Sequence, residues 1–508
     1  MTAITENRAV LRLHESDNIL VALDALPAGV PLGGGLRTAE PVPAGHKIAA
    51  AEIAPGAPVR KYGQIIGVAT QPVPAGAHVH SHNLGMGAHR QDYGFGSEAV
   101  PLPAAAARAE FLGYRRPSGQ SGTRNYLGIL TSVNCAGSVA RFIAEAAARE
   151  DLLAAFPGID GIVPVTHGSG CGMSGKGEGY DTLFRTLAGY ARNPNFGAIL
   201  MIGLGCEVMQ IPDLAGRQAL GDRARFRYMT IQHEGGTRAT VERGLAILRE
   251  LAAEADRARR EPLPASGLVL GMQCGGSDGY SGITANPALG HASDLLVAQG
   301  GISILSETSE IYGAEHLLTR RAADPATGQR LVELIDWWEA YTARNFGEMD
   351  NNPSPGNKRG GLTTILEKSL GAVAKAGRAP LSGVYRFAEP VTRPGFAFMD
   401  SPGYDPCSVT GQTASGANLI AFTTGRGSVS GYQPVPCLKI ASNSDLWRRM
   451  EPDMDIDCGA ILEGVPIEEK GREIFEALLA LASGRPSKSE AQGFGAVEFV
   501  PWQLGAVM

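Results

Sequence analysis

The chain has 508 residues, a formal net charge of −6, 44% hydrophobic residues and 19% charged residues. This composition excludes fibrous and disordered classes, and the weak negative charge argues against a nucleic-acid partner. The length predicts two to four domains. The sequence has neither an apolar tract of about 18 residues nor a basic-then-apolar leader, so we expect no membrane partner and a cytoplasmic location. Seven cysteines, a sparse and odd number, favour reduced thiols.

The beginning of the chain predicts a small all-β domain. Residues 10–90 carry short alternating segments that are separated by turn signals such as "PAGV", "PAGH" and "APGA". The next segment mixes glycine, proline and alanine without periodicity, which is typical of a linker. We therefore place the first domain at residues 1–90 and a linker at 91–112.

From residue 113 the pattern changes to alternating strands and helices. Short apolar runs such as "NYLGILTSV" precede amphipathic stretches such as "SVARFIAEAAARED", which predicts helices around a parallel sheet. The stretch "TVERGLAILRELAAEADRARREPLP" predicts a helix that is stopped by proline. After it, "GLVLGMQCGG" begins the pattern again. We therefore predict a middle α/β domain at 113–258 and a C-terminal α/β catalytic domain at 259–508.

Four of the seven cysteines follow the end of an apolar strand and stand next to glycine. They are Cys135, Cys171, Cys206 and Cys274. Ligands of open α/β proteins bind beyond the carboxyl ends of the strands, so these thiols could meet there and hold iron or zinc as thiolates. The alternative is that each is a small buried hydrophobic residue, and the sequence has no CxxC pair to decide the matter.

Other polar side chains follow the same strand ends: His167, Glu207, Ser277, Asp278, Glu307 and Glu310. As a set they offer metal ligands and acid–base groups, although each alone could be a helix cap or a solvated loop residue. Two later turns present Asn357 with Lys358 and Thr424 with Arg426. Lys358 and Arg426 suit a carboxylate substrate, the arginine through a bidentate fork. The alternative is surface charge beside a turn.

The segment "HVHSHN" at residues 78–83 places a histidine at every second position. In a β-strand the side chains of His78, His80 and His82 would project from one face. That face could chelate a metal or bind an anionic, hydroxyl-rich ligand, and the alternative is a solvated strand edge. The same domain has two further compact polar clusters, "GHK" with His46 and Lys47 and "KYG" with Lys61 and Tyr62. We therefore expect it to close over an active site.

These motifs resemble those of the altronate and galactarate dehydratases along almost the whole chain. The resemblance rests on "GHKIA", "VRKYGQIIG", "HVHSHN", "GTRNYLGILTSVNC", "MIGLGCE", "CGGSDGYSGITANP", "NPSPGNKRGG" and "FTTGRG". It implies an N-terminal SAF (β-clip) domain, a middle domain and a C-terminal α/β domain with a largely parallel, Rossmann-like sheet. It also implies a homodimer.

The resemblance further implies loss of water from a sugar acid to give a 2-keto-3-deoxy acid, with Fe²⁺, or another divalent cation in its place, under reducing conditions. Removing a proton next to a carboxylate needs a base, and a metal can stabilise the charge that develops. On this resemblance we assign Cys171, Cys206, Cys274 and Glu307 to the metal and His46, Lys47, His167 and Asp278 to acid–base catalysis. The substrate would contact Tyr62, His78, His80, His82, Asn83, Ser277, Asn357, Lys358, Thr424 and Arg426.

The sequence leaves other functions open. "HVHSHN" favours altronate over galactarate as the substrate, whereas residues 398–432 are similar to sulfolactate sulfo-lyases, which would release sulfite. A nicotinamide-dependent oxidoreductase is disfavoured because no strand is followed by GxGxxG and a ribose-binding acid. A non-catalytic binding protein built on the SAF domain would show no activity with any metal.

Overall fold

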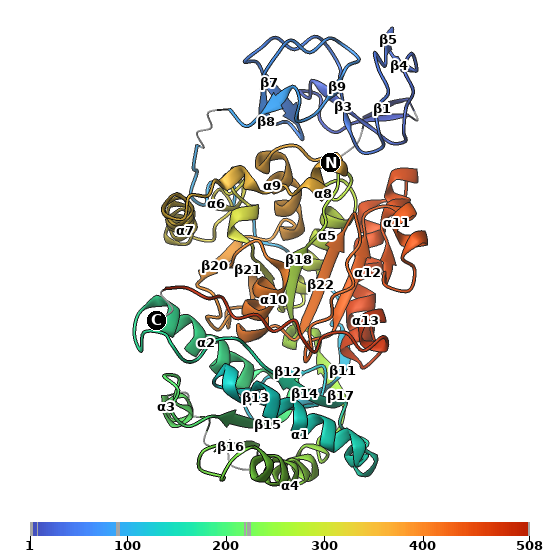
Figure 1. Ribbon diagram of the computed structural model, residues 1–508. Helices are drawn as coiled ribbons and strands as arrows, with labels where there is room; N and C mark the ends of the chain where they lie inside the picture. Colours follow the sequence, from blue (N-terminus) through green and yellow to red (C-terminus); the bar gives the residue numbers. More distant parts are fainter. Residues whose placement is uncertain (1–3, 8, 88–91, 218–219, 221–224, 506–508) are drawn as a thin grey trace.

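The computed structural model of the chain describes residues 4–7, 9–87, 92–217, 220 and 225–505. In Figure 1 an N-terminal β-domain lies at the top, a large α/β domain at the centre and a smaller α/β domain at the bottom. The multidomain α/β fold with an all-β beginning is the fold that the sequence predicts. In these ranges no helix combines the length and the apolar character that a membrane span requires.

The N-terminal domain consists of antiparallel strands. Five form the sheet β1-β2-β3-β6-β9 and three form the sheet β10-β8-β7, while β4 and β5 form a hairpin. Its core includes Val21, Val59 and Ile66, and Ile283 of the C-terminal domain packs against this core. The strands are β1 (Ile4–Asn7), β2 (Val10–Arg12), β3 (Ile19–Ala22), β4 (Pro31–Gly33), β5 (Leu36–Arg37), β6 (Lys47–Ala49), β7 (Pro58–Lys61), β8 (Gln64–Ala69), β9 (His78–Val79) and β10 (Leu84–Gly85).

The middle domain is built on four parallel strands in the order β14-β13-β15-β16. Two of its helices, α1 and α4, cover one face of the sheet, and the other face packs against α2 and against strands of the C-terminal domain. The elements are β13 (Tyr126–Thr131), α1 (Gly137–Arg149), β14 (Gly161–Val165), α2 (Glu178–Arg192), β15 (Phe196–Gly203), α3 (Ile211–Arg217), β16 (Phe226–Thr230) and α4 (Thr237–Ala255).

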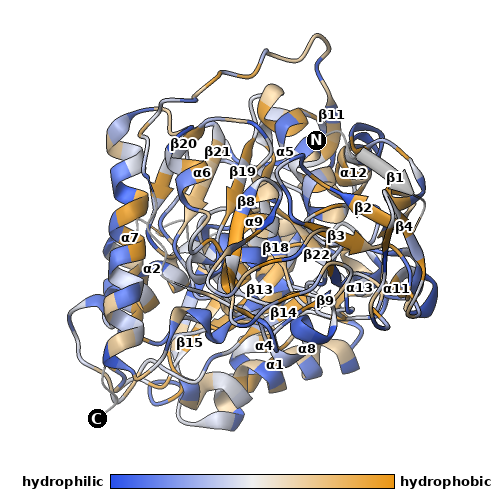
Figure 2. Cartoon of the chain, turned by 90° about the horizontal axis from the view of Figure 1, so that it is seen from above, coloured by the Kyte–Doolittle hydropathy of each residue, from blue (hydrophilic) through white to orange (hydrophobic). Residues whose placement is uncertain are grey.

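The C-terminal domain has seven parallel strands in the order β20-β21-β19-β18-β22-β23-β24. The central strands are buried along almost their whole length, which explains their continuous apolar sequences. Figure 2 shows these strands as hydrophobic and the outer helix α7 with hydrophilic residues along its length. The strands are β18 (Val269–Cys274), β19 (Ile302–Leu305), β20 (Leu381–Tyr385), β21 (Gly395–Met399), β22 (Leu419–Thr424), β23 (Cys437–Ala441) and β24 (Ile456–Asp457).

Helices surround this sheet, and α5 packs against α12 on one of its faces. The helices are α5 (Ala285–Ala298), α6 (His316–Thr319), α7 (Pro325–Arg344), α8 (Pro355–Arg359), α9 (Ile365–Val373), α10 (Asp405–Ala414), α11 (Ser444–Arg449), α12 (Ile467–Ala482) and α13 (Lys488–Ala491). The end of the chain returns to the middle domain, where the ring of Phe499 lies 4.5 Å from that of Tyr190 in α2.

The connection between the two α/β domains differs from the prediction. The helix predicted to stop at the prolines at 262 and 264 already ends at Ala255, and Glu261–Pro264 form β17, which pairs with β11 (Glu110–Arg115). Two prolines prevent helix continuation there, and Leu263 and Phe111 are buried by the strand pairing. β11 also pairs with β12 (Ser121–Gly122) and begins inside the predicted linker. The predicted boundary at residue 90 lies outside the described residues.

Candidate active site

The topology of the C-terminal sheet locates a binding crevice. Strands β19, β20 and β21 all lie on one side of β18, in the spatial order β19, β21, β20. The chain then crosses to β22 on the other side of β18. Ligands of open α/β sheets bind at such a switch point, beyond the carboxyl ends of the strands. The two loops that leave this point are in contact, since the backbone N–H groups of Gly425 and Arg426 donate to the carbonyl oxygen of Gly276 at 3.1 and 2.8 Å.

Asp278 organises the loops around this crevice. Its Oδ1 accepts hydrogen bonds from the backbone of Tyr280 and Ser281 and from the hydroxyl of Ser442, and its Oδ2 accepts one from the amide of Asn443. Burial raises the pKa of Asp278, while these hydrogen bonds oppose the increase. Because both carboxylate oxygens are engaged, this predicted acid–base residue is placed as a positioning group.

Several predicted substrate contacts also hold the loops in place. The Asn357 amide donates to the carbonyl oxygen of the buried Ser277 at 2.8 Å and closes a capping box with Ser354 at the start of α8. The Thr424 hydroxyl accepts from the backbone N–H of Gly427 at 2.9 Å.

Two cations remain at the crevice. Lys358 is half-buried and Arg426 is exposed, and within the described part of the chain neither forms an ion pair. These two side chains are therefore free to bind an anion.

The structure brings His46, His78, His80 and His82 together. The ring of His46 lies 5.1 Å from that of His78 and 4.9 Å from that of His80, and the ring of His82 lies 5.5 Å from that of His78. The predicted strand is not the cause, because β9 ends at Val79. Instead the side chain of Asn83 accepts from the backbone N–H of His80 and donates to the carbonyl oxygen of His78, which folds the segment into a turn.

The hydrogen bonds define the tautomers of these imidazoles. Nε2 of His80 lies 2.9 Å from the carbonyl oxygen of Lys358, and Nε2 of His46 lies 3.3 Å from that of Arg359. A carbonyl oxygen only accepts, so both Nε2 atoms carry the proton. Nδ1 of His46 therefore accepts from Nε2 of His78, at 3.0 Å. In neutral rings this leaves Nδ1 of His78 and of His80 with a lone pair.

Burial keeps these rings neutral. Desolvation lowers the pKa of His46 to about 4 and that of His78 to about 3, and neighbouring imidazoles contribute to both decreases. The pKa of His80 is also lowered, again chiefly by burial. At neutral pH the cluster therefore offers lone pairs that can accept a proton.

A buried ion-pair network ties the N-terminal domain to the C-terminal domain. Lys47 and Lys61 place their ammonium groups 2.8 and 2.9 Å from the two carboxylate oxygens of Glu367 in α9, and all three side chains are fully buried. Burial alone would raise the pKa of Glu367, but the two ammonium groups hold it well below its usual value. Lys47 also donates to the carbonyl oxygen of Gly361 at 2.7 Å. This predicted acid–base residue is therefore engaged as a tether.

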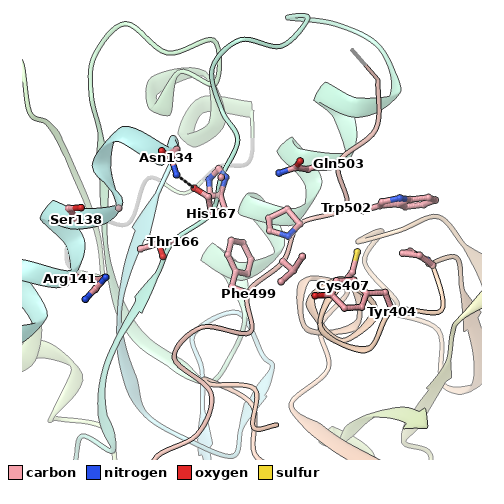
Figure 3. Close-up of a pocket in the computed structure, with 15 residues that line it drawn as sticks. Asn134, Ser138, Arg141, Thr166, His167, Tyr404, Cys407, Phe499, Trp502 and Gln503 are labelled. Carbon is pink, nitrogen blue, oxygen red and sulfur yellow. Dashed lines mark hydrogen bonds between the residues drawn. The ribbon is translucent and has the colours of Figure 1, made fainter. Parts of the chain in front are cut away.

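Two predicted site residues, Tyr62 and His167, line other cavities. Tyr62 lines a separate cavity of about 470 Å³ together with Leu13 and Pro287. His167 lines a cavity of about 760 Å³ between the middle and C-terminal domains, where Figure 3 shows it near Asn134 and Phe499. Its Nε2 lies 3.0 Å from the carbonyl oxygen of Thr131, and its Nδ1 accepts from the backbone N–H of Ser169. Both ring nitrogens of His167 are thus occupied by the backbone.

A candidate metal site lies at the ends of β18 and β19. Cys274, Glu307 and Glu310 place one ligand atom each within 4.8 Å of one another, and all three are buried. Burial raises the pKa of Cys274 to about 12 and, with help from the Glu310 carboxylate, that of Glu307 to about 8. The backbone of Glu307 is left-handed, with φ +71°.

Cys274, Glu307 and Glu310 suit a bound cation, although two lysines already neutralise part of the negative charge of the glutamates. Lys375 lies 3.3 Å from Oε2 of Glu307, and Lys368 lies 2.7 Å from Oε1 of Glu310. The other oxygen of Glu307, Oε1, is buried and has no hydrogen-bond partner among the described residues. An unpartnered buried carboxylate oxygen beside a thiol and a second carboxylate suits a borderline divalent cation.

The single set of sulfur ligands that the sequence predicts is divided between two domains. Cys274 lies at the end of β18, whereas Cys171 and Cys206 are exposed and follow β14 and β15 of the middle sheet. The group of ligand atoms around Cys274 contains Glu307 and Glu310 but neither of these two thiols, so the structure does not bring the predicted set together.

Sequence reasoning did not assign Glu367, Lys368 or Lys375. All three lie in "TILEKSLGAVAKAG", an otherwise apolar helical stretch. Charged residues on a helix that is apolar all round are buried and must be paired. That pattern was the signal that could have identified them.

The fold and the site define a three-domain α/β protein in which an N-terminal β-domain brings imidazoles to the carboxyl edge of a parallel sheet.

Three family models match the chain in order. The altronate/galactarate dehydratase SAF domain matches residues 8–87, the second domain of D-galactarate dehydratase/altronate hydrolase matches 113–256, and the C-terminal domain of D-galactarate/altronate dehydratase matches 265–507.

Individual relatives agree with these matches. The chain is 37% identical to altronate dehydratase of Escherichia coli, over 95% of this chain and 97% of that protein. It is also 37% identical to galactarate dehydratase (L-threo-forming) of the same organism, over 94% and 93%. The β subunit of (2R)-sulfolactate sulfo-lyase from Chromohalobacter salexigens is 34% identical, over 75% of this chain and 95% of that protein. The chain belongs to the altronate/galactarate dehydratase family, and the predicted family is confirmed.

Proposed function

We propose that the chain is a hydro-lyase that removes water from a sugar acid of the altronate or galactarate type. The observation that carries this proposal is the family match, which runs through all three domains in order. The neutral imidazoles and the two free cations at one crevice suit the same reaction, because it begins with the removal of a proton next to a carboxylate.

In the proposed reaction, a base takes the proton from C2 and the hydroxyl group on C3 leaves as water after protonation. The resulting enol takes a proton at C3 and becomes the 2-keto-3-deoxy acid. His80 is the candidate base, since its Nε2–H is held by Lys358 and its Nδ1 carries the lone pair. A bound substrate carboxylate would raise the pKa of this imidazole towards neutrality, where general bases work best.

The remaining residues would hold the substrate or the base. Lys358 and Arg426 are the candidate ligands of the substrate carboxylate, because neither forms an ion pair with a residue that the structure describes. His78, through its hydrogen bond to His46, would fix the imidazole cluster. Asp278 would act as a positioning residue through the loops that it joins.

Cys274, Glu307 and Glu310 are the residues that would hold a divalent cation, and we propose Fe²⁺. A cation bound there would supply Lewis-acid stabilisation of the negative charge that develops on the substrate. The seven free cysteines support a reducing compartment such as the cytoplasm. The homodimer stays a prediction, which sedimentation analysis would test.

The similarity to the sulfo-lyase subunit favours a second candidate, the release of sulfite from sulfolactate. One anaerobic assay separates the two functions. The reduced protein is given Fe²⁺ and is offered altronate, galactarate or sulfolactate, and both 2-keto acid and sulfite are measured. We expect keto acid from one of the sugar acids without sulfite. Sulfite release alone would replace the proposal, and no product from any substrate would refute it.

The same assay tests the site. His80→Gln should reduce kcat by about 10²- to 10⁴-fold, the usual contribution of a general base. His14→Gln is the matched control, because His14 is an exposed histidine of the same domain that is hydrogen-bonded to Ser16. Equal activity of the two variants would remove the imidazole of His80 from the proposed reaction.

A further inference from the structure

Three exposed cysteines lie at the same edge of the middle sheet. The neighbouring strands β13, β14 and β15 are parallel, and Cys135, Cys171 and Cys206 follow their carboxyl ends. The other four cysteines are buried in the C-terminal domain. The exposed thiols therefore form a separate group that the proposed reaction does not use.

Backbone hydrogen bonds join the three loops that carry these thiols. The N–H of Asn134 donates to the carbonyl oxygen of Ser169 at 2.9 Å. The N–H groups of Val208 and Met209 donate to that of Gly170 at 3.1 and 3.2 Å. Each cysteine lies within two residues of one of these bonds, and two residues span at most about 7 Å. The three loops, and with them the backbones of the three cysteines, are thus held in one region.

Glycines and a buried carboxylate build this region. Gly170 has φ +99°, and a Cβ atom there would lie 2.1 Å from the carbonyl oxygen of Ser132, so only glycine permits the contact between the two loops. Gly205, with φ +127°, directly precedes Cys206. The buried Glu207 accepts from the Ser132 hydroxyl and from the Gly205 N–H, both at 2.6 Å, and so fixes the Cys206 loop against the end of β13.

Two observations point to the kind of ligand. The amide N–H of Gln232 donates to Sγ of Cys206 at 3.5 Å, and hydrogen bonds of this kind stabilise and tune metal-bound thiolates. Within the described residues, only Cys274, Glu307 and Glu310 bring three ligand atoms within 4.8 Å of one another. A single ion bound at about 2.3 Å by each thiolate would keep its sulfurs within about 4 Å of one another. The wider spacing suits a cluster of several metal ions.

We propose that Cys135, Cys171 and Cys206 bind an iron–sulfur cluster and leave one iron without a protein thiolate. Clusters of this type take thiolate ligands, and each thiol loses its proton on binding. Cys135 lies between Asn134 and Gly137, which both line the cavity of about 760 Å³ in Figure 3. The open iron position would therefore adjoin a cavity of the size that holds small molecules.

The test measures cluster binding by the full chain without any substrate, so its outcome is independent of the proposed dehydration. The protein is purified without oxygen and reconstituted with inorganic sulfide and equal amounts of ferrous and ferric iron, which supply the mixed valence of a cluster without an external oxidant. Acid-labile sulfide, iron and the visible spectrum are then measured. We expect the wild type to bind iron and sulfide in equal amounts. The three variants Cys135→Ser, Cys171→Ser and Cys206→Ser should each retain at most about one tenth of the wild-type sulfide.

Two control variants separate this site from the rest of the chain. Cys274→Ser alters the candidate metal site at β18, and Cys437→Ala alters a buried cysteine of the C-terminal core. Both should retain the sulfide and the spectrum of the wild type. Loss of sulfide from Cys274→Ser together with its retention by the three middle-domain variants would overturn the proposal.

A second measurement covers the case in which a serine variant fails to fold. The reconstituted wild type is alkylated with iodoacetamide, and the modified cysteines are identified by mass spectrometry. The three exposed thiols should be protected in the loaded protein and modified in the unloaded protein. Their full modification in the loaded protein, or no sulfide binding by the wild type, would overturn the proposal.

Discussion

Glu367 offers a direct test of how the N-terminal domain is held over the crevice. Glu367→Gln removes the one negative charge that faces the ammonium groups of Lys47 and Lys61, all of them fully buried. Glu367 also accepts two hydrogen bonds from Thr363, at 2.8 and 3.0 Å, so its carboxylate is saturated with donors. The substitution would leave two buried ammonium groups without a counter-ion.

Breaking a buried ion pair on one side destabilises by about 3–5 kcal/mol. The loss should appear as easier separation of the N-terminal domain, because the network joins β6 and β7 to α9. Since each 1.36 kcal/mol is a factor of ten, native-state hydrogen exchange in peptides that contain β6 and β8 should accelerate by about 150- to 5,000-fold. Peptides of the middle domain should exchange as they do in the wild type.

Two further variants separate the ionic effect from a loss of packing. Glu261→Gln breaks the exposed pair between Arg115 and Glu261, which should change exchange little, because surface pairs contribute about 0–1 kcal/mol. A triple variant, Lys47→Met with Lys61→Met and Glu367→Leu, removes every charge and should restore much of the protection. Unchanged exchange in Glu367→Gln would refute the reasoning, since the domain would then be held by its other hydrogen bonds and its apolar contacts, without the ion pairs.

Three other predictions concern the crevice. Arg426→Ala should raise KM for the sugar acid by about tenfold or more and Arg426→Lys should restore part of the affinity, whereas equal KM values would exclude a carboxylate contact. Burial lowers the pKa of His46 to about 4 and that of His78 to about 3 from the usual 6.5, so protonation of these rings favours separation of the N-terminal domain from the crevice. Protection of β6 from hydrogen exchange should therefore be constant above pH 6.5 and should decrease as the pH falls towards 4. If β6 were protected at pH 5 as strongly as at neutral pH, or more strongly, this pH dependence would be contradicted. Glu307→Gln should weaken binding of the divalent cation by about 10- to 100-fold in a metal titration, and wild-type affinity would remove Glu307 from the ligands.

Local sequence patterns predicted the elements but not their meeting points. The apolar runs that became β13, β15, β18 and β22 are visible because a strand buried on both faces has to be apolar throughout. The helix after β16 was predicted too long, since the strand pairing of Leu263 with Phe111 depends on residues about 150 positions away.

In the candidate site, too, the sequence predicted local groups of residues but not which distant groups meet. The sequence identified His78, His80 and His82 as one group, although a turn closed by Asn83 gathers them in place of a strand face. The predicted boundary at residue 258 places Cys171 and Cys206 in a different domain from Cys274, but the sequence could not reveal whether the two domains bring these thiols together, because every parallel strand presents its carboxyl end in the same local pattern. Which strands share an edge is decided by tertiary packing.

The central claim is that the chain removes water from a sugar acid by taking the proton from C2. The most direct measurement is an NMR analysis of the product formed in D₂O by the reduced, iron-supplied protein. The account predicts a 2-keto-3-deoxy acid with one deuterium at C3, because the enol takes its new proton from the solvent. A product without deuterium at C3, or release of sulfite without any keto acid from a sugar acid, would contradict the claim.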